Sequence, residues 1–195
     1  GGGGSRLIKT HLPRRLCPIS RQARYIYVVR HPLSCFASCV DFIRGNLRGF
    51  APSLEEFEHW FCSGELMWWD TWPEHVAGWW DRAESQRNVL LVRFEDMVDD
   101  LPAVIRRVAS FLGGDPLDDS EIRAVAAKCA FSYMKQHADV FEMHPPHLLQ
   151  ADNPFFVRGG RDRCTQVPAQ VRRRVADWCR EACEALGFPV EALYP

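Results

Sequence analysis

The 195-residue sequence has no long hydrophobic run and no excess of charge of one sign. No apolar stretch approaches the roughly 20 residues that a membrane-spanning helix needs, and no charged-then-apolar leader opens the chain. Twenty-four Lys and Arg against 25 Asp and Glu leave a net charge of −1, so the broad positive footprint of a nucleic-acid-binding protein is absent. We therefore expect a cytoplasmic globular protein that binds neither membranes nor nucleic acids. Any anion site must be a local cluster of arginines.

The eight cysteines lack the spacings of a zinc site. There is no Cys-x-x-Cys pair and no Cys–His ladder, which argues against the common zinc patterns. Cys35 and Cys39, and likewise Cys179 and Cys183, lie four residues apart on expected helices. We expect buried or half-buried thiols in a reducing compartment and no metal. A disulfide framework is the alternative.

Strands and helices alternate along the rest of the chain. Residues 1–5, Gly-Gly-Gly-Gly-Ser, have the composition of a flexible linker or an expression scar and are left out of the fold prediction. Residues 6–195 predict one α/β domain, with strands over 6–10, 25–29 and 88–94. The continuous apolar run over 25–29 is typical of a parallel strand buried on both faces.

The helix signals follow the strand signals. Apolar residues recur at helical spacing over 33–40, and Ser53 with Glu56 forms a capping box that should start the next helix. Further helices are expected at 101–112, ended by two glycines, at 121–129 and at 171–186. The tryptophans over 68–80 favour core over a pocket wall, and residues 136–165 read as a long loop.

Three groups of residues could carry chemistry. On a strand, Lys9 and His11 would share one face, which suits proton removal beside a cation that stabilises an anionic group. Arg30 ends a buried strand and Ser38 lies in the helix that follows, so together they could hold a phosphate. For both pairs taken alone, an ordinary structural role is the better interpretation. The basic loop around Arg158, Gly159 and Gly160 is as consistent with a solvated loop as with an anion site.

Six motifs, in order, resemble the cytosolic-type sulfotransferase family. They are KTHLP (9–13), YIYVVRHPLSCFAS (25–38), WPEHVAGWW (72–80), VLLVRFEDM (89–97), AFSYMK (130–135) and FFVRGG (155–160). The resemblance implies a parallel sheet flanked by helices, related to P-loop kinases. It also implies transfer of a sulfuryl group from 3′-phosphoadenylyl sulfate (PAPS) to an alcohol, phenol or amine, which leaves 3′-phosphoadenosine 5′-phosphate (PAP), without a metal.

The same resemblance assigns roles to individual residues. His11 matches the catalytic base and Lys9 the lysine that contacts the transferring group. Arg30 and Ser38 match the pair that binds the 3′-phosphate. The remaining cofactor-binding matches are Phe94, in place of the family's tyrosine, Phe131 beside the adenine, and Arg158, Gly159 and Gly160 in place of Arg-Lys-Gly. The Trp-rich segment and the loop over 136–157 would form the wall and lid of the acceptor pocket.

One part of the family pattern is missing. The first strand and its glycine-rich, lysine-bearing loop, which binds the 5′-phosphosulfate, are not in the sequence. Residues 6–195 therefore correspond to the C-terminal part of the domain, and we expect this chain to be weak or inactive and to expose an unpaired sheet edge. A second hypothesis is a non-catalytic module that binds 3′-phosphoadenosine or a partner. A third is a P-loop nucleotide kinase. The dimerisation segment is barely recognisable around 165–169, which leaves a homodimer open.

Overall fold

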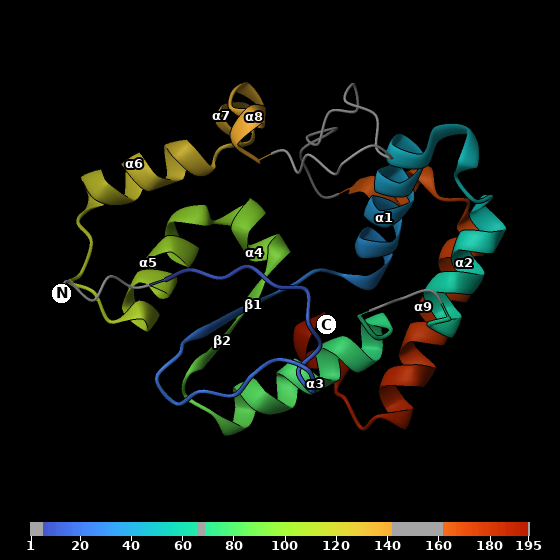
Figure 1. Ribbon diagram of the computed structural model, residues 1–195, viewed down its shortest axis with the longest axis horizontal. Helices are drawn as coiled ribbons and strands as arrows, with labels where there is room; N and C mark the ends of the chain where they lie inside the picture. Colours follow the sequence, from blue (N-terminus) through green and yellow to red (C-terminus); the bar gives the residue numbers. More distant parts are fainter. Residues whose placement is uncertain (1–5, 66–68, 142–161, 195) are drawn as a thin grey trace.

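A two-stranded parallel sheet lies at the centre of the molecule. Figure 1 shows the computed structural model, which describes residues 6–65, 69–141 and 162–194. Strand β1 (Tyr25–Val29) pairs with β2 (Val89–Arg93), in a register that sets Val29 opposite Arg93. The strands predicted over 25–29 and 88–94 are therefore confirmed to within a residue.

The strand predicted over 6–10 is wrong, because these residues form coil. Within the described residues the sheet has two strands, and no third strand pairs with the other edge of β1. Local hydrogen bonds take the place of strand pairing. The hydroxyl of Thr10 accepts from the N–H of Leu12 at 3.1 Å, and the carbonyl of Pro13 accepts from Leu16 and Cys17 in a turn.

Helices make up most of the remaining described structure. They are α1 (Pro32–Leu47), α2 (Leu54–Ser63), α3 (Trp72–Ser85), α4 (Phe94–Asp99), α5 (Leu101–Leu112), α6 (Asp119–Cys129), α7 (Phe131–Gln136), α8 (Ala138–Phe141), α9 (Ala169–Ala185) and α10 (Val190–Leu193), with 3₁₀ turns η1 (Arg48–Phe50) and η2 (Asp162–Gln166). The helices predicted over 101–112, 121–129 and 171–186 correspond to α5, α6 and α9. The long loop predicted over 136–165 is wrong at its two ends, where α8 and η2 lie, and its middle lies outside the described residues.

Capping residues fix where the central helices begin. The side chain of Ser53 accepts from the N–H of Glu56 at 3.2 Å, and the Glu56 carboxylate accepts from the N–H of Ser53 at 2.7 Å, which confirms the predicted capping box of α2. Helix α3 has a second box, formed by Thr71 and Glu74, that the sequence analysis did not identify. These caps satisfy backbone N–H groups at the first turns of α2 and α3 and so fix where the two helices begin.

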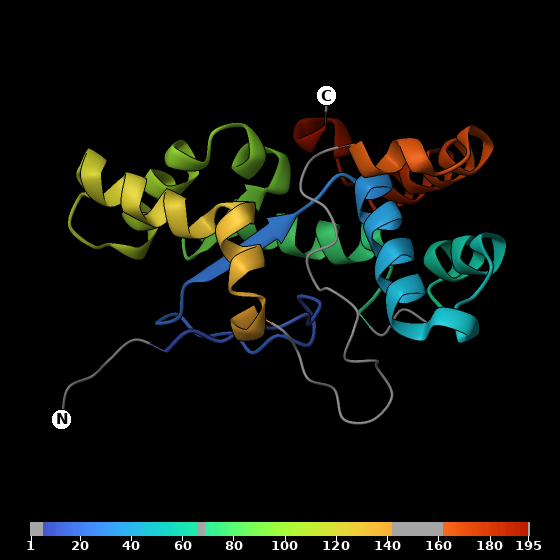
Figure 2. The same ribbon diagram turned by 90° about the horizontal axis from the view of Figure 1, so that it is seen from above.

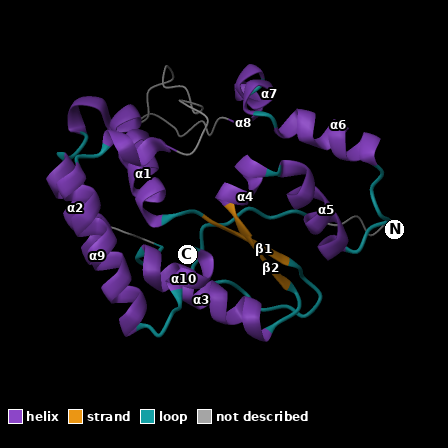
Figure 3. Ribbon diagram, turned by 180° about the vertical axis from the view of Figure 1, so that it is seen from behind, coloured by secondary structure: helices purple, strands orange, loops and turns teal. Residues whose placement is uncertain are grey.

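The main core lies among α1, α2, α3 and α9. Figures 1 and 2 show α1, α2 and α9 grouped on one side of the strands, with α5 and α6 on the other, and Figure 3 shows α10 close to α3. Phe36, Phe61 and Val175 are almost completely buried between the helices. Trp72 and Trp79 are also buried, so these two tryptophans are core, as predicted, but Trp69 is 38% exposed, so the prediction is wrong for that residue.

The two faces of β1 differ. Tyr27 stacks on Trp79 of α3, with ring centroids 5.4 Å apart. Ile26 and Val28 point to the opposite face and stay 39% and 50% exposed. The prediction that this strand is buried on both faces is therefore wrong, because none of the described segments covers Ile26 and Val28 fully. Among the described helices, none is both long enough and apolar enough to cross a lipid bilayer.

Candidate active site

The carboxyl ends of β1 and β2 lie side by side, and charged and aromatic residues follow each. Arg30 and His31 follow β1, and Phe94 and Glu95 follow β2. The carboxylate of Glu95 accepts from the N–H of His31 at 3.0 Å and from the hydroxyl of Tyr194 at 3.3 Å. Glu95 therefore ties the two strand ends to the last helix. In open α/β sheets this edge is where ligands bind.

The guanidinium of Arg30 lies over the ring of Phe94. Its central carbon is 4.4 Å from the ring centroid, a cation–π distance. The carbonyl of Arg30 accepts from the indole N–H of Trp72 at 3.0 Å, so the backbone is fixed as well. The family resemblance alone predicted that Arg30 and Phe94 belong to one site, and the structure brings the two into contact.

Ser38 lies in the second turn of α1, half-buried, on the helix that begins directly after Arg30. The positive charge of Arg30 acts on a thiol of this helix. A hydrogen bond from Cys35, assisted by Arg30, lowers the pKa of Cys39, although burial opposes the shift. All eight cysteines are free thiols, so the alternative of a disulfide framework is wrong. Seven are buried or half-buried, as expected, but Cys129 is exposed, so the prediction is wrong for that residue. In the part of the chain that the structure describes, no three His, Cys, Asp or Glu side chains gather into a metal site.

Lys9 and His11 lie on exposed coil, so no strand brings them to one face. The carbonyl of His11 faces Nε2 of His75 on α3, at 3.3 Å. The His11 imidazole lies beside Trp69, with ring centroids 5.7 Å apart. Asp70, directly after Trp69, has a left-handed backbone with a φ of 72°. A bidentate ion pair with Arg15 holds the Asp70 side chain in place.

The other predicted site residues are less closely placed. Phe131 begins α7, which packs mainly against α6 and α8, and it is half-buried. Arg158, Gly159 and Gly160 lie outside the described residues. Just after them, η2 packs against α1, so the chain returns to the helix that carries Ser38.

Sequence reasoning missed His75 and Tyr27 as site residues, whereas Trp69 lies in the Trp-rich segment that was predicted to form the wall of the acceptor pocket. Both missed residues lie inside quoted motifs, and the signal for His75 is its spacing. His75 lies three residues after Trp72 and four before Trp79, so it shares their helix face.

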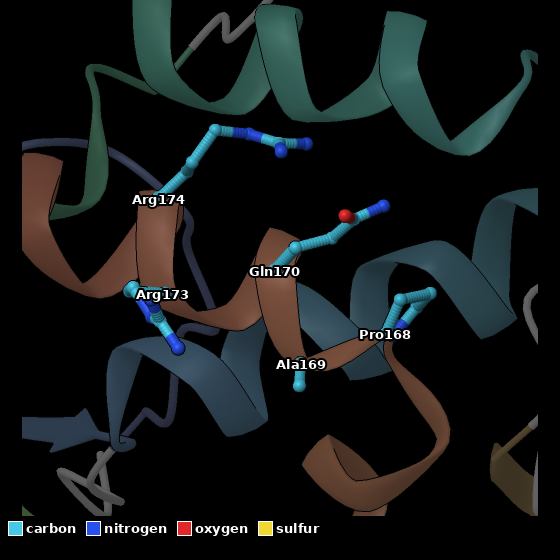
Figure 4. A pocket seen from close by; sticks show the side chains of 5 residues that line it. All are labelled: Pro168, Ala169, Gln170, Arg173 and Arg174. Carbon is cyan, nitrogen blue, oxygen red and sulfur yellow. The ribbon is translucent and has the colours of Figure 1, made fainter.

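An open hollow of about 600 Å³ lies elsewhere, at the start of α9 (Figure 4). It is lined by Pro168, Ala169, Gln170, Arg173 and Arg174. Arg174 extends toward α2 and forms an ion pair with Glu58 at 2.6 Å. This hollow contains none of the predicted site residues.

Comparison with known proteins assigns the class. The sulfotransferase domain family matches residues 4–187. The chain is 34% identical over 159 residues to cytosolic sulfotransferase 1 of *Danio rerio*, covering 79% of this chain and 52% of the relative. It is 27% identical to luciferin sulfotransferase of *Photinus pyralis* over 204 residues, covering 97% of this chain and 54% of the relative. This chain belongs to the sulfotransferase family.

A solved structure agrees with that assignment. The structure of mouse sulfotransferase SULT7A1 in complex with PAP superimposes with a TM-score of 0.73 at 28% identity, covering 89% of this chain and 63% of that one. The predicted fold class, α/β with a parallel sheet flanked by helices, is therefore confirmed. The chain spans about half the length of the curated relatives that it matches.

Proposed function

We propose that this chain forms the part of a sulfotransferase that binds the 3′-phosphate of PAPS and carries its general base, His11. The observation that carries the proposal is the placement of Arg30. Its guanidinium lies on Phe94 at the carboxyl ends of both strands, beside the helix that carries Ser38. The similarity to a sulfotransferase solved with PAP supports the nucleotide class.

The residues present suit a phosphate. Arg30 supplies guanidinium N–H donors and Ser38 a hydroxyl, and charge-assisted bonds of this kind are stronger than neutral ones. By the family resemblance, Arg158, Gly159 and Gly160 would add further donors to the same phosphate. Phe94 and Phe131 offer aromatic faces for the adenine. PAPS would supply the sulfuryl group when bound.

His11 and Lys9 would serve the acceptor end of the site. His11 removes the proton from the acceptor hydroxyl or amine, and the ammonium of Lys9 stabilises negative charge on the transferring oxygens. Trp69, beside the His11 ring, offers an aromatic wall for a small acceptor. A cytoplasmic location agrees with the name of the *Danio rerio* relative, and a homodimer stays a prediction.

Transfer of labelled sulfate from PAPS to a panel of phenols and alcohols tests the catalytic half of the proposal. We expect slow transfer by this chain, and a His11→Ala variant should lose about 100-fold or more, the usual contribution of a general base. The matched control is His59→Ala, an exposed histidine of α2, which should keep the parent rate.

The alternative is a module that binds 3′-phosphoadenosine and does not transfer. The exposed coil that carries Lys9 and His11 favours it, because catalytic groups usually need rigid support. If the folded chain binds PAP but neither it nor any variant transfers sulfate, this alternative is established. That result would contradict the proposal that His11 acts as a general base.

A further inference from the structure

Two aromatic side chains of α3, His75 and Trp79, hydrogen-bond through their ring nitrogens to the backbone carbonyls of His11 and Leu12. Nε2 of His75 lies 3.3 Å from the carbonyl oxygen of His11, and the indole N–H of Trp79 donates to the carbonyl of Leu12, also at 3.3 Å. His75 and Trp79 are one helical turn apart, and the two carbonyls belong to consecutive residues. Helix α3 therefore holds a coil segment that has no strand partner among the described residues.

The protonation of His75 follows from its partners. A carbonyl oxygen only accepts hydrogen bonds, so Nε2 must carry a proton for the bond to His11 to form. The other ring nitrogen, Nδ1, lies 2.9 Å from the hydroxyl of Tyr27. Burial lowers the pKa of His75, so the ring is neutral and Nδ1 is bare. Burial raises the pKa of Tyr27, which keeps its hydroxyl protonated and able to donate.

Other groups support the same arrangement. The rings of Tyr27 and His75 stack with centroids 5.6 Å apart, and Tyr27 is packed in turn on Trp79. The charged or titratable groups that act on His75 are Asp70, which favours its proton, and His11, which opposes it. Arg15 pairs with Asp70 and offsets that carboxylate.

We propose that His75 is a positioning residue, which takes its orientation from Tyr27 and holds the His11 backbone so that the His11 imidazole lies beside Trp69. The inference rests on the proposed function, because it concerns the base of that reaction. His75 itself touches no reacting atom in this scheme. Its role is to fix the backbone at His11, directly after residues 6–10, which have no strand partner among the described residues.

Nuclear magnetic resonance of the ¹⁵N,¹³C-labelled chain tests the inference without relying on turnover. The ring ¹⁵N shifts of His75 should show a protonated Nε2 and a bare Nδ1 at neutral pH. In Tyr27→Phe the Nε2 proton should exchange with water on the order of 2- to 10-fold faster, as one neutral hydrogen bond predicts. A protonated Nδ1 with a bare Nε2 in the parent chain would overturn the proposal, and this result needs no variant that folds.

A matched pair of variants tests the hydrogen bond from His75 to the carbonyl of His11. His75→Leu should shift the His11 carbonyl ¹³C resonance upfield, because a bonded carbonyl loses its donor. His75→Gln keeps a side-chain N–H near the place of Nε2 and should restore most of the shift, while the control His59→Leu should leave it unchanged. A carbonyl resonance that does not move in His75→Leu would contradict the inference.

The same variants separate this inference from the proposed function. If transfer is detected, His75→Leu should lower kcat with little change in KM, and His75→Gln should recover the rate. A kcat that stays at the parent value in His75→Leu would overturn the positioning role. If PAP does not bind and PAPS gives no transfer, but the ring ¹⁵N shifts and the carbonyl ¹³C shift are as expected, the proposed function fails and the positioning of His11 by His75 stands.

Discussion

Arg82 carries a charge into the core of the molecule. Its side chain is 1% exposed and, within the described residues, its two terminal nitrogens have no hydrogen-bond partner. The guanidinium lies over Tyr25 at 4.0 Å and over Trp79 at 5.4 Å, and only Nε is bonded, to Gln86. Cation–π contact compensates only part of the desolvation cost at this site.

Replacing Arg82 by methionine should therefore stabilise the fold. Methionine keeps much of the volume and removes the buried charge, so we expect a gain of about 1–3 kcal/mol in the free energy of unfolding. Urea denaturation measures it. Arg82→Ala, which leaves a cavity, should gain less or lose stability, and a large loss in Arg82→Met would contradict this interpretation.

The ring of Phe94 supports the guanidinium of Arg30 through a cation–π contact in the proposed site. Phe94→Leu removes the cation–π contact and should weaken PAP binding on the order of 2- to 30-fold, since such contacts contribute about 0.5–2 kcal/mol. Phe94→Tyr keeps the ring and should bind at least as well as the parent. Equal affinities of the leucine and parent proteins in a calorimetric titration would show that this contact has no role.

Two histidines make stability depend on pH. Burial lowers the pKa of His31 and of His75, so the unfolded chain binds protons more readily than the folded one. Stability should therefore fall as pH drops from about 7.5 to about 5.5, through the ordinary histidine value of about 6.5. Thermal unfolding across this range measures it. His75→Gln should show a shallower dependence, and an unchanged slope would mean that His75 does not contribute.

At the scale of elements, the capping box of α2 offers a simple test. Ser53→Ala removes the acceptor for the N–H of Glu56 and should cost about 0.5–2 kcal/mol of stability. The control is Ser110→Ala, an exposed position inside α5, which should be neutral or slightly stabilising. Chemical denaturation of both compares them, and equal effects would argue against the cap.

Elements with strong local signals could be predicted from the sequence, and those without could not. The β-rich runs gave both strands, and the Ser53 box and Gly113 gave helix ends that the structure confirms. Residues 6–10 have a strand-like composition, but the Thr10 hydroxyl satisfies a backbone donor locally and the ring donors of α3 bind the next carbonyls. That outcome depends on a helix more than 60 residues away, which local pattern does not reveal.

Some contacts of the candidate site could also be predicted from the sequence, and others could not. The family resemblance predicted that Arg30 and Phe94 belong to one site, and their contact follows because each comes directly after one of two parallel strands that end at the same edge. The role proposed for His75 could not be predicted, because its two hydrogen-bond partners, the His11 carbonyl and the Tyr27 hydroxyl, lie on the coil and on β1, both far from it in the sequence. Lys9 and His11 were expected on a shared strand face that does not exist.

At the scale of the molecule, the sheet presents a partly exposed apolar face, and its edge along β1 has no strand partner among the described residues. Ile26 and Val28 are partly exposed on β1, and exposed strand edges promote self-association. Val28→Thr keeps the β-branched shape and should reduce light scattering at high protein concentration, while changing stability by less than about 1 kcal/mol. Scattering equal to that of the parent would show that this face does not mediate association.

The central claim is that Arg30 binds the 3′-phosphate of the nucleotide. The most direct test is a calorimetric titration of the chain with PAP, beside Arg30→Ala and the control Arg106→Ala, whose guanidinium pairs with Asp119 on the surface. We predict binding by the parent and by the Arg106 variant and its loss in the Arg30 variant. Equal binding by all three, or no binding by a parent shown to be folded, would contradict the claim.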